Sequence, residues 1–192
     1  VAVKDAPDAA QMPQIKGDVA FDHVTFSYKE DAAEPVLSDI NLSIHSGETI
    51  GILGGTGSSK SSLVNLISRL YDVSEGRLLV GGKDVREYDI ETLRDEVSVV
   101  LQKNVLFSGT IASNLRFGNQ DATDAELDDA IEIAQASEFV TEKASGIDSP
   151  ISQGGSNVSG GQKQRLSIAR AIAKNPQIYI FDDSFSALDL KT

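Results

Sequence analysis

The sequence predicts an α/β domain in which a mixed β-sheet is interrupted by an inserted helical subdomain. Residues 19–28, VAFDHVTFSY, alternate apolar and polar side chains as a half-buried strand does. Residues 178–181, IYIF, form a continuous apolar run that is typical of a strand buried on both faces of a parallel sheet. Between Gln102 and about residue 164 the sequence carries helix signals and no convincing strand, so we expect the helices to be an insertion between strands.

The remaining elements of the sheet are expected on the N-terminal side of this insertion. We predict a domain at residues 19–192, preceded at residues 1–18 by a linker rich in Ala, Asp, Gln, Lys and Pro. The sheet should be mixed at its start and parallel inside. Further strands are expected at residues 40–44, 49–53, 76–82 and 97–102, with a turn at Ser46 and Gly47, and helices at residues 63–70 and 90–97.

Two capping boxes indicate where helices begin in the C-terminal half. Thr123 is followed three residues later by Glu126, and apolar residues then recur at helical spacing, at Leu127, Ala130, Ile131 and Ala134. Ser159 and Gln162 have the same spacing and should begin a helix that stops at Asn175 and Pro176. The inward residues of this second helix are expected to be Leu166, Ala169, Ile172 and Ala173.

Composition and charge exclude several classes of protein. The chain has 17 basic and 29 acidic residues, a net charge of −12, and no basic stripe, so we expect no nucleic acid partner. No run approaches the roughly 18 to 20 apolar residues that cross a bilayer, so we expect a soluble fragment that meets a membrane only through another domain. The absence of cysteine excludes disulfides and thiolate metal sites.

A glycine- and serine-rich loop predicts a phosphate-binding site. It lies between an expected strand and an expected helix and consists of Gly54, Gly55, Thr56, Gly57, Ser58, Ser59, Lys60, Ser61 and Ser62. Backbone N–H groups of such a loop curl around phosphate oxygens, Lys60 reaches the terminal phosphates, and Ser61 is placed to ligate Mg²⁺. The pattern G-x-x-x-x-G-K-[ST] has one departure, because Ser59 stands at its second glycine. A plain strand-to-helix turn with an incidental lysine is the alternative.

An acidic pair at the end of the apolar run supports the phosphate-binding interpretation. In a phosphate-loop enzyme the strand beside the loop ends in an aspartate that holds Mg²⁺ next to the triphosphate, and Asp182 fits this role. Without the loop, Asp182 and Asp183 would be read as ordinary solvated acids.

A second candidate anion site lies at the helix that begins with VSGGQ. The capping box explains Ser159 and Gln162, but not Gly160 and Gly161, which are poor helix formers in the first turn. Exposed N–H groups and a serine hydroxyl at a helix start can bind an anion. One chain with two half-sites suggests two chains with two complete sites.

From about Asp18 to its end the sequence resembles the nucleotide-binding domains of ABC exporters. The phosphate loop at residues 54–62, the signature loop VSGGQ at 158–162 and the metal strand ending at Asp182 match that family. The resemblance implies a P-loop NTPase fold, with a RecA-like core, an antiparallel β subdomain and a helical subdomain at about 103–164. It implies ATP and Mg²⁺ as cofactors, and an upstream transmembrane domain that places the chain at the cytoplasmic face of the cell membrane.

The resemblance also implies roles for particular residues. Tyr28 stands where the family stacks an aromatic ring on adenine, although a strand-edge tyrosine is the alternative. Gln102 matches the glutamine that senses Mg²⁺ and couples to the membrane domain, and residues 186–189, SALD, resemble the loop that signals across the dimer. Ser159, Gly160, Gly161 and Gln162 would then contact the nucleotide of a second nucleotide-binding domain. In this comparison the chain is a fragment that stops after the SALD loop.

Three departures from the family pattern qualify these expectations. Asp183 stands where the family has a catalytic glutamate, and its shorter side chain predicts slow hydrolysis at this chain's own loop. We therefore expect the degenerate half of a heterodimer, whose intact signature loop completes the partner's site. Ser59 either keeps phosphate at a distance or donates to it, and the sequence leaves both open. His23 and His45 are expected to be ordinary strand or surface residues, because the family's histidine lies beyond Thr192.

Two other functional classes were weighed. An ABC-type ATPase of DNA repair or chromosome maintenance would need coiled-coil insertions and a basic surface, and the sequence has neither. A plain phosphate-loop kinase would lack VSGGQ. The transported molecule is not encoded in this chain, although family resemblance favours a drug or a lipid.

Overall fold

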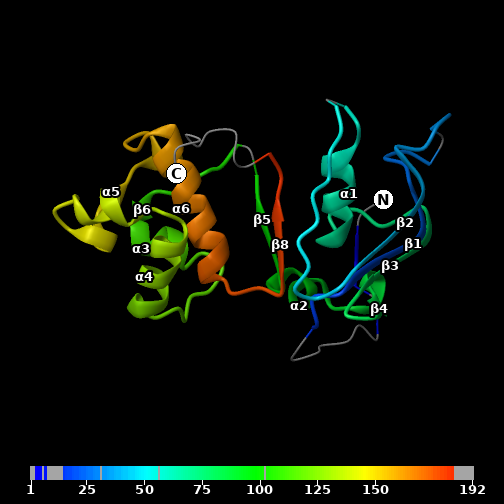
Figure 1. Ribbon diagram of the computed structural model, residues 1–192, viewed down its shortest axis with the longest axis horizontal. Coiled ribbons are helices and arrows are strands. Elements are labelled where there is room, and N and C mark those ends of the chain that lie inside the picture. Colours follow the sequence, from blue (N-terminus) through cyan, green and yellow to red (C-terminus); the bar gives the residue numbers. More distant parts are fainter. Residues whose placement is uncertain are drawn as a thin grey trace. The chain divides into compact units, whose positions relative to one another are not determined.

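The computed structural model divides the chain into two units, Val1–Val97 and Ser98–Thr192 (Figure 1). The residues described are 3–5, 7, 15–30, 32–55, 57–101 and 103–183. We call residues 1–97 the β unit and residues 98–192 the helical unit. No helix within the described ranges is long and apolar enough to cross a membrane.

The β unit is built on a four-stranded antiparallel sheet in the order β2-β1-β3-β4. The central strand β1, Val19–Phe26, pairs with β2, Leu37–Ile44, and with β3, Glu75–Val80, and β4 is Lys83–Asp84. The register shifts within β1, where His23 has φ 51°. Val19 and Phe21 lie two residues apart, and so do Val24 and Phe26, but the two pairs are three residues apart rather than two. All four side chains are buried, because a bulge inserts one residue between the pairs.

Two helices complete the β unit. Helix α1, Lys60–Ile67, buries Leu63, Leu66 and Ile67, and α2 is Ile90–Asp95, preceded by a 3-10 turn at Val85–Glu87. The prediction that the first of these helices extends to Leu70 is wrong, since Leu70 is 49% exposed and lies beyond the helix end. Arg69 has φ 50°, and a left-handed residue ends a helix. The predicted turn at Ser46 and Gly47 is confirmed.

The predicted strand at residues 49–53 is not formed. Residues 48–55 lie outside every strand, and Ile50, Ile52 and Leu53 are 45%, 38% and 97% exposed. Among the described residues none is paired with this stretch in a β-ladder. Apolar sequence favours a strand, but a strand exists only where a neighbour supplies its hydrogen bonds, which explains the difference.

The helical unit contains a second, two-stranded sheet made of β5, Val97–Val100, and β8, Ile178–Phe181. Helix α6, Gly160–Ala173, is tied to it through Ser98 Oγ, which donates to Ala171 O at 3.2 Å. The expectation that residues 178–181 are buried on both faces is wrong. Ile180 is buried, whereas Tyr179 and Phe181 are 41% and 40% exposed, because alternate side chains of a strand point to opposite faces.

Short helices make up the rest of this unit, and the first two of them pack against α6 (Figure 1). They are α3, Ile111–Leu115, α4, Asp124–Ile133, and α5, Ser137–Thr141, with 3-10 turns at Gly146–Asp148 and Gln153–Gly155. A two-residue pairing of β6, Gly109–Thr110, with β7, Pro150–Ile151, was not expected from the sequence. Both predicted capping boxes are confirmed, at Thr123 and at Ser159. Leu115, Leu127 and Leu166, at the centre of the packing, are fully buried.

Candidate functional site

The loop before α1 holds the ammonium group of Lys60 within its own backbone. Lys60 Nζ donates to Gly54 O at 2.7 Å, to Gly55 O at 3.0 Å and to Ser58 Oγ at 3.2 Å. Ser58 N donates to Gly55 O at 3.2 Å, which closes a tight turn. A positive charge therefore lies in the loop at the start of a helix, where the helix dipole also favours an anion.

The glycines of this loop fit a nucleotide triphosphate. A Cβ on Gly54 would collide with Ser58 Oγ, whereas a Cβ on Gly55 or Gly57 would meet nothing within 4 Å. Gly57 has φ 80°, a backbone conformation that glycine adopts without strain. The backbone near Gly55 and Gly57 is thus open to a close approach, as phosphate oxygens require. Ser61, in the first turn of α1, is exposed and can act as an oxygen ligand of Mg²⁺.

Ser59 occupies a position that glycine would occupy more readily. It has φ 63° and ψ 19°, in the left-handed region, and it makes no side-chain cap hydrogen bond to α1. A non-glycine residue in this region costs on the order of 1–3 kcal/mol. The departure from the phosphate-loop pattern is therefore a source of backbone strain beside Lys60.

An aromatic cluster lies beside the phosphate helix. The hydroxyl groups of Tyr28 and Ser62 are hydrogen-bonded at 2.8 Å. The Tyr28 ring meets Phe26 at 4.9 Å and 77° and Tyr71 at 5.1 Å and 85°, both edge to face. Phe26 is buried, whereas Tyr28 and Tyr71 are 51% and 40% exposed. Tyr28 thus offers an exposed ring beside α1, and its contact with adenine stays a prediction. Sequence reasoning missed Tyr71, which carries no motif.

The helical unit presents the second predicted half-site at the start of α6. Ser159 Oγ accepts from Gln162 N at 3.2 Å, and Gln162 Oε1 accepts from Ser159 N at 3.0 Å. The first-turn N–H groups of Gly160 and Gly161 lie beyond this reciprocal cap, and a Cβ on Gly160 would meet nothing within 4 Å. The Ser159 hydroxyl accepts in this cap, so its proton can still donate to an anion oxygen.

The two acidic residues follow β8 directly. Asp182 N donates to Val100 O at 2.9 Å, which fixes the end of β8 against β5. Asp183 is exposed and has φ 50°. They belong to the helical unit and the phosphate loop belongs to the β unit, so their distances to Lys60 and Ser61 stay predictions. Thr56, Gln102 and residues 186–189 lie outside the described residues.

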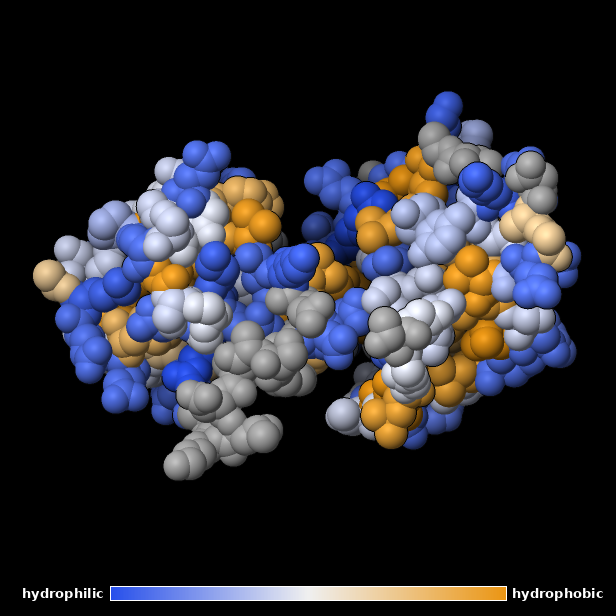
Figure 2. Space-filling model, turned by 90° about the horizontal axis from the view of Figure 1, so that it is seen from above, coloured by the Kyte–Doolittle hydropathy of each residue, from blue (hydrophilic) through white to orange (hydrophobic). Residues whose placement is uncertain are grey.

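The helical unit also exposes an aromatic patch that sequence reasoning did not single out. Phe107 and Phe117 stack at 4.6 Å and 22°, and Phe117 is 65% exposed. Arg170 lies over the Phe107 ring at 6.0 Å and donates to Val105 O at 3.0 Å, and burial lowers the pKa of Arg170 from its usual value. Figure 2 shows apolar surface of this kind among hydrophilic side chains in both units.

Taken with its α/β units, the loop around Lys60 defines a phosphate-loop nucleotide-binding domain. Residues 37–186 match the model of the ABC transporter family. The chain belongs to this family, and it is an ABC ATPase domain with the P-loop NTPase fold.

Similar proteins agree with this assignment. The chain is 45% identical over 188 residues to a putative multidrug export ATP-binding/permease protein of Bacillus subtilis, covering 98% of this chain and 32% of that protein. It is 48% identical over 191 residues to an uncharacterized ABC transporter ATP-binding protein of Mycobacterium tuberculosis, covering 97% and 32%. A solved bacterial Atm1-family ABC exporter with ATP bound has a TM-score of 0.91 and 35% identity, covering 98% of this chain and 33% of that one.

The chain thus spans about a third of the length of these relatives. Their names describe transport proteins, so the alternative of a DNA-repair or chromosome-maintenance ATPase is not favoured.

Replacing Ser59 by Gly should stabilise the β unit, because glycine adopts the left-handed conformation without the serine's strain. We expect the free energy of unfolding to rise by about 1 kcal/mol in urea denaturation. Ser46→Gly is the control, since Ser46 is an exposed turn residue of the same unit without a positive φ and should gain nothing. An equal or lower stability of Ser59→Gly would contradict the strain.

Proposed function

We propose that this chain is the ATP-binding and ATP-hydrolysing domain of a half-transporter that exports molecules across a membrane. The observation that carries the proposal is the loop around Lys60 at the start of α1, combined with the export proteins among the relatives. A membrane domain upstream of residue 1 would place the chain at the cytoplasmic face of the cell membrane. A drug or a lipid is the transported class that this resemblance favours.

Nucleotide binding is proposed to rest on three groups of the β unit. Lys60 exchanges its backbone carbonyl partners for phosphate oxygens, which form stronger charge-assisted hydrogen bonds. The N–H groups around Gly55 and Gly57 surround the phosphates, and the exposed ring of Tyr28 stacks on adenine. Ser61, Asp182 and Gln102 would hold Mg²⁺, which neutralises charge on the phosphates when bound.

The start of α6 is proposed to serve the nucleotide of a second nucleotide-binding domain. Ser159, Gly160 and Gly161 present a serine hydroxyl and first-turn N–H groups at the start of α6, and such groups can bind a phosphate of a nucleotide that another domain's loop holds. Two domains arranged head to tail would give each phosphate loop a signature loop from its partner. Gln162 contributes by orienting Ser159 through the capping box.

Asp183, which stands where the family has a glutamate, is proposed to make this chain the degenerate half of a heterodimer, the half whose own site hydrolyses ATP slowly. Asp183 is one C–C bond, about 1.5 Å, shorter than a glutamate, so its carboxylate reaches less far toward an attacking water. The capping box at Ser159 is intact, which supports a role for this chain in completing the partner's active site.

The aromatic patch of the helical unit is proposed to contact the membrane domain. Val105, Phe107 and Phe117 expose apolar surface a few residues after Gln102, and their exposure fits a partner that is apolar in part. Gln102 and this patch would pass the motion of nucleotide binding to the membrane helices.

Binding of ATP to the complete chain tests the core of the proposal. We expect Lys60→Ala to weaken binding of both ATP and inorganic tripolyphosphate by about 10- to 100-fold, because charge-assisted hydrogen bonds to phosphate are lost. Isothermal titration measures both ligands, and Lys83→Ala is the control for a loss of positive charge elsewhere in the β unit. Equal affinities of Lys60→Ala and the unchanged chain would refute the phosphate site.

The role of Tyr28 separates adenine from phosphate recognition. Tyr28→Ala should weaken ATP binding by about 10-fold and leave tripolyphosphate binding unchanged, since only the base stacks on the ring. Tyr28→Phe keeps the ring and loses the contact with Ser62, so it should bind ATP nearly as well as the unchanged chain. A similar loss for ATP and tripolyphosphate would instead indicate that Tyr28 supports the loop.

The degenerate-site hypothesis predicts a gain of activity. In the full-length protein with its partner subunit, Asp183→Glu should raise ATP turnover at this chain's own site by up to about 10²-fold, because the longer carboxylate reaches the attacking water. Phosphate release measures turnover, and Asp183→Asn, which supplies no base, is the control. If glutamate and asparagine give the same rate, Asp183 does not limit hydrolysis.

A further inference from the structure

A buried arginine joins the end of α1 to the first residues of the chain. Arg69 is 3% exposed, and its Nε donates to Asp72 Oδ1 at 2.8 Å. Its Nη2 donates to the main-chain oxygen of Lys4 at 2.9 Å, and Nη1 donates to Tyr88 O at 3.5 Å. A guanidinium is almost never buried without partners, so the Lys4 carbonyl is one of the acceptors that make this burial possible.

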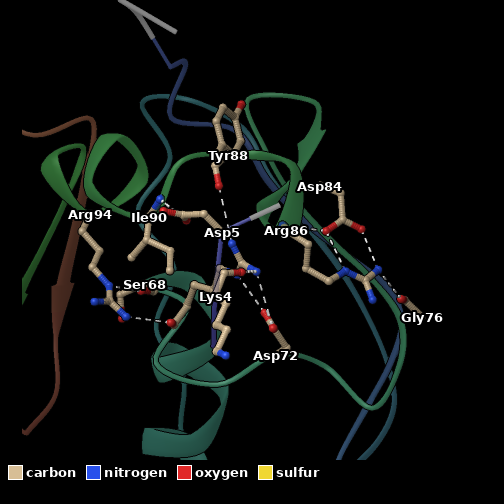
Figure 3. Close-up of polar contacts among 11 residues, drawn as sticks. Lys4, Asp5, Ser68, Asp72, Gly76, Asp84, Arg86, Tyr88, Ile90 and Arg94 are labelled. Carbon is tan, nitrogen blue, oxygen red and sulfur yellow. Dashed lines mark hydrogen bonds and ion pairs between the residues drawn. The ribbon is translucent and has the colours of Figure 1, made fainter. Parts of the chain in front are cut away.

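The next residue of the same segment is held by α2. Asp5 Oδ1 accepts from Ile90 N, in the first turn of α2, at 2.8 Å (Figure 3). Asp89 caps the same helix by accepting from Thr92 N at 2.9 Å. Two backbone N–H groups of this turn therefore have side-chain acceptors. Asp89 accepts from Thr92 N, and Asp5, 85 positions before Ile90, accepts from Ile90 N.

Helix α2 in turn holds two carbonyl groups directly after α1. Arg94 Nε donates to Ser68 O at 3.1 Å, and Arg94 Nη2 donates to Arg69 O at 2.9 Å (Figure 3). These carbonyls have no acceptor role inside the helix, so their partners decide how firmly the helix ends. The segment Lys4–Asp5, the start of α2 and the end of α1 thus form one hydrogen-bonded corner.

Part of the predicted linker is therefore packed on the β unit. Ile15 is 2% exposed, and a Cβ on Gly81 would approach Ile15 Cγ2 to 3.2 Å. Gly81 N donates to Asp18 O at 2.8 Å. In the segment before β1, Lys4–Asp5 and residues 15–18 thus contact the rest of the β unit.

We infer that the corner made by Arg69 and the start of α2 is a docking surface for the chain's own segment Lys4–Asp5, and that Arg69 is a positioning residue for the phosphate loop. Helix α1 has eight residues, about 12 Å, with Lys60 at one end and Arg69 just past the other. A helix this short depends on its tertiary contacts, so loosening its C-terminal end also loosens its first turn. Docking of the segment therefore strengthens nucleotide binding at Lys60. This inference rests on the proposed nucleotide site.

The chain offers a substitution that removes one docking contact and little else. Proline is favoured at the first position of a helix, and Asp89 has φ −57° and ψ 132°, which suits a residue before proline. Ile90→Pro lacks the N–H that Asp5 accepts, and Ile90→Ala is the matched control that shortens the side chain and keeps the N–H. Arg69→Lys is a second variant, because lysine cannot form the forked set of hydrogen bonds.

Docking of the segment is measured by the rate at which trypsin cleaves the complete chain after Lys4. The effect of Arg69 on the phosphate loop is measured by hydrogen exchange and by titration with ATP. Relative to Ile90→Ala, we expect Ile90→Pro and Arg69→Lys to be cleaved after Lys4 about 10-fold faster, since a charge-assisted hydrogen bond is lost. The amide of Leu63, which donates to Ser59 O at 3.0 Å, should exchange several-fold faster, and the affinity for ATP should fall about 3-fold.

Each outcome decides one part of the inference. Equal cleavage of Ile90→Pro and Ile90→Ala would overturn the docking surface. Faster cleavage with unchanged exchange at Leu63 would overturn the positioning role, and so would unchanged ATP affinity. If the unchanged chain bound no ATP, the proposed function would fail, while cleavage and the exchange of Leu63 would still decide docking and positioning.

Discussion

The ammonium group of Lys60 has to lie inside a backbone loop and at the first turn of a helix at once, and the rest of the site depends on this constraint. The chain meets it by turning through left-handed residues, Gly57 and Ser59, directly before α1. The helix is then fixed by buried Leu63 and Leu66 along its length and by hydrogen bonds from Arg94 at its end. A cation placed in this way is held by backbone oxygens that phosphate can replace, so binding requires little rearrangement of the helix.

The proposed second half-site, at Ser159, also lies at the start of a helix. At the start of α6, the capping box between Ser159 and Gln162 orders the first turn, and Gly160 leaves its backbone uncovered. A helix start alone contributes only a partial charge, so it suits recognition of a phosphate whose charge is balanced by another group. Under the proposed function, the phosphate loop and the helix start that complete one site would belong to two different domains arranged head to tail.

Elements set by neighbours in sequence were predicted well. The capping boxes at Thr123 and Ser159 and the turn at Ser46 and Gly47 follow from contacts within a few residues. The failures involve distant partners. Residues 49–53 have the composition of a strand but no described ladder partner, and Tyr71 joins the Tyr28 ring only through folding. The docking of Lys4 on Arg69 spans 65 residues and leaves no local pattern.

By itself, the sequence identified the class of protein, because the phosphate loop and the signature loop are each short patterns whose spacing is enforced by local backbone geometry. It also showed that Ser59 departs from the residue pattern of the phosphate loop. Only the tertiary structure showed that Ser59 has a left-handed backbone conformation and makes no side-chain cap hydrogen bond. It also showed that a buried arginine, Arg69, donates a hydrogen bond to the segment before β1. The contact between Arg69 and the segment before β1 depends on which groups lose water together when distant parts of the chain pack, and burial of that kind is not encoded by any neighbouring residue.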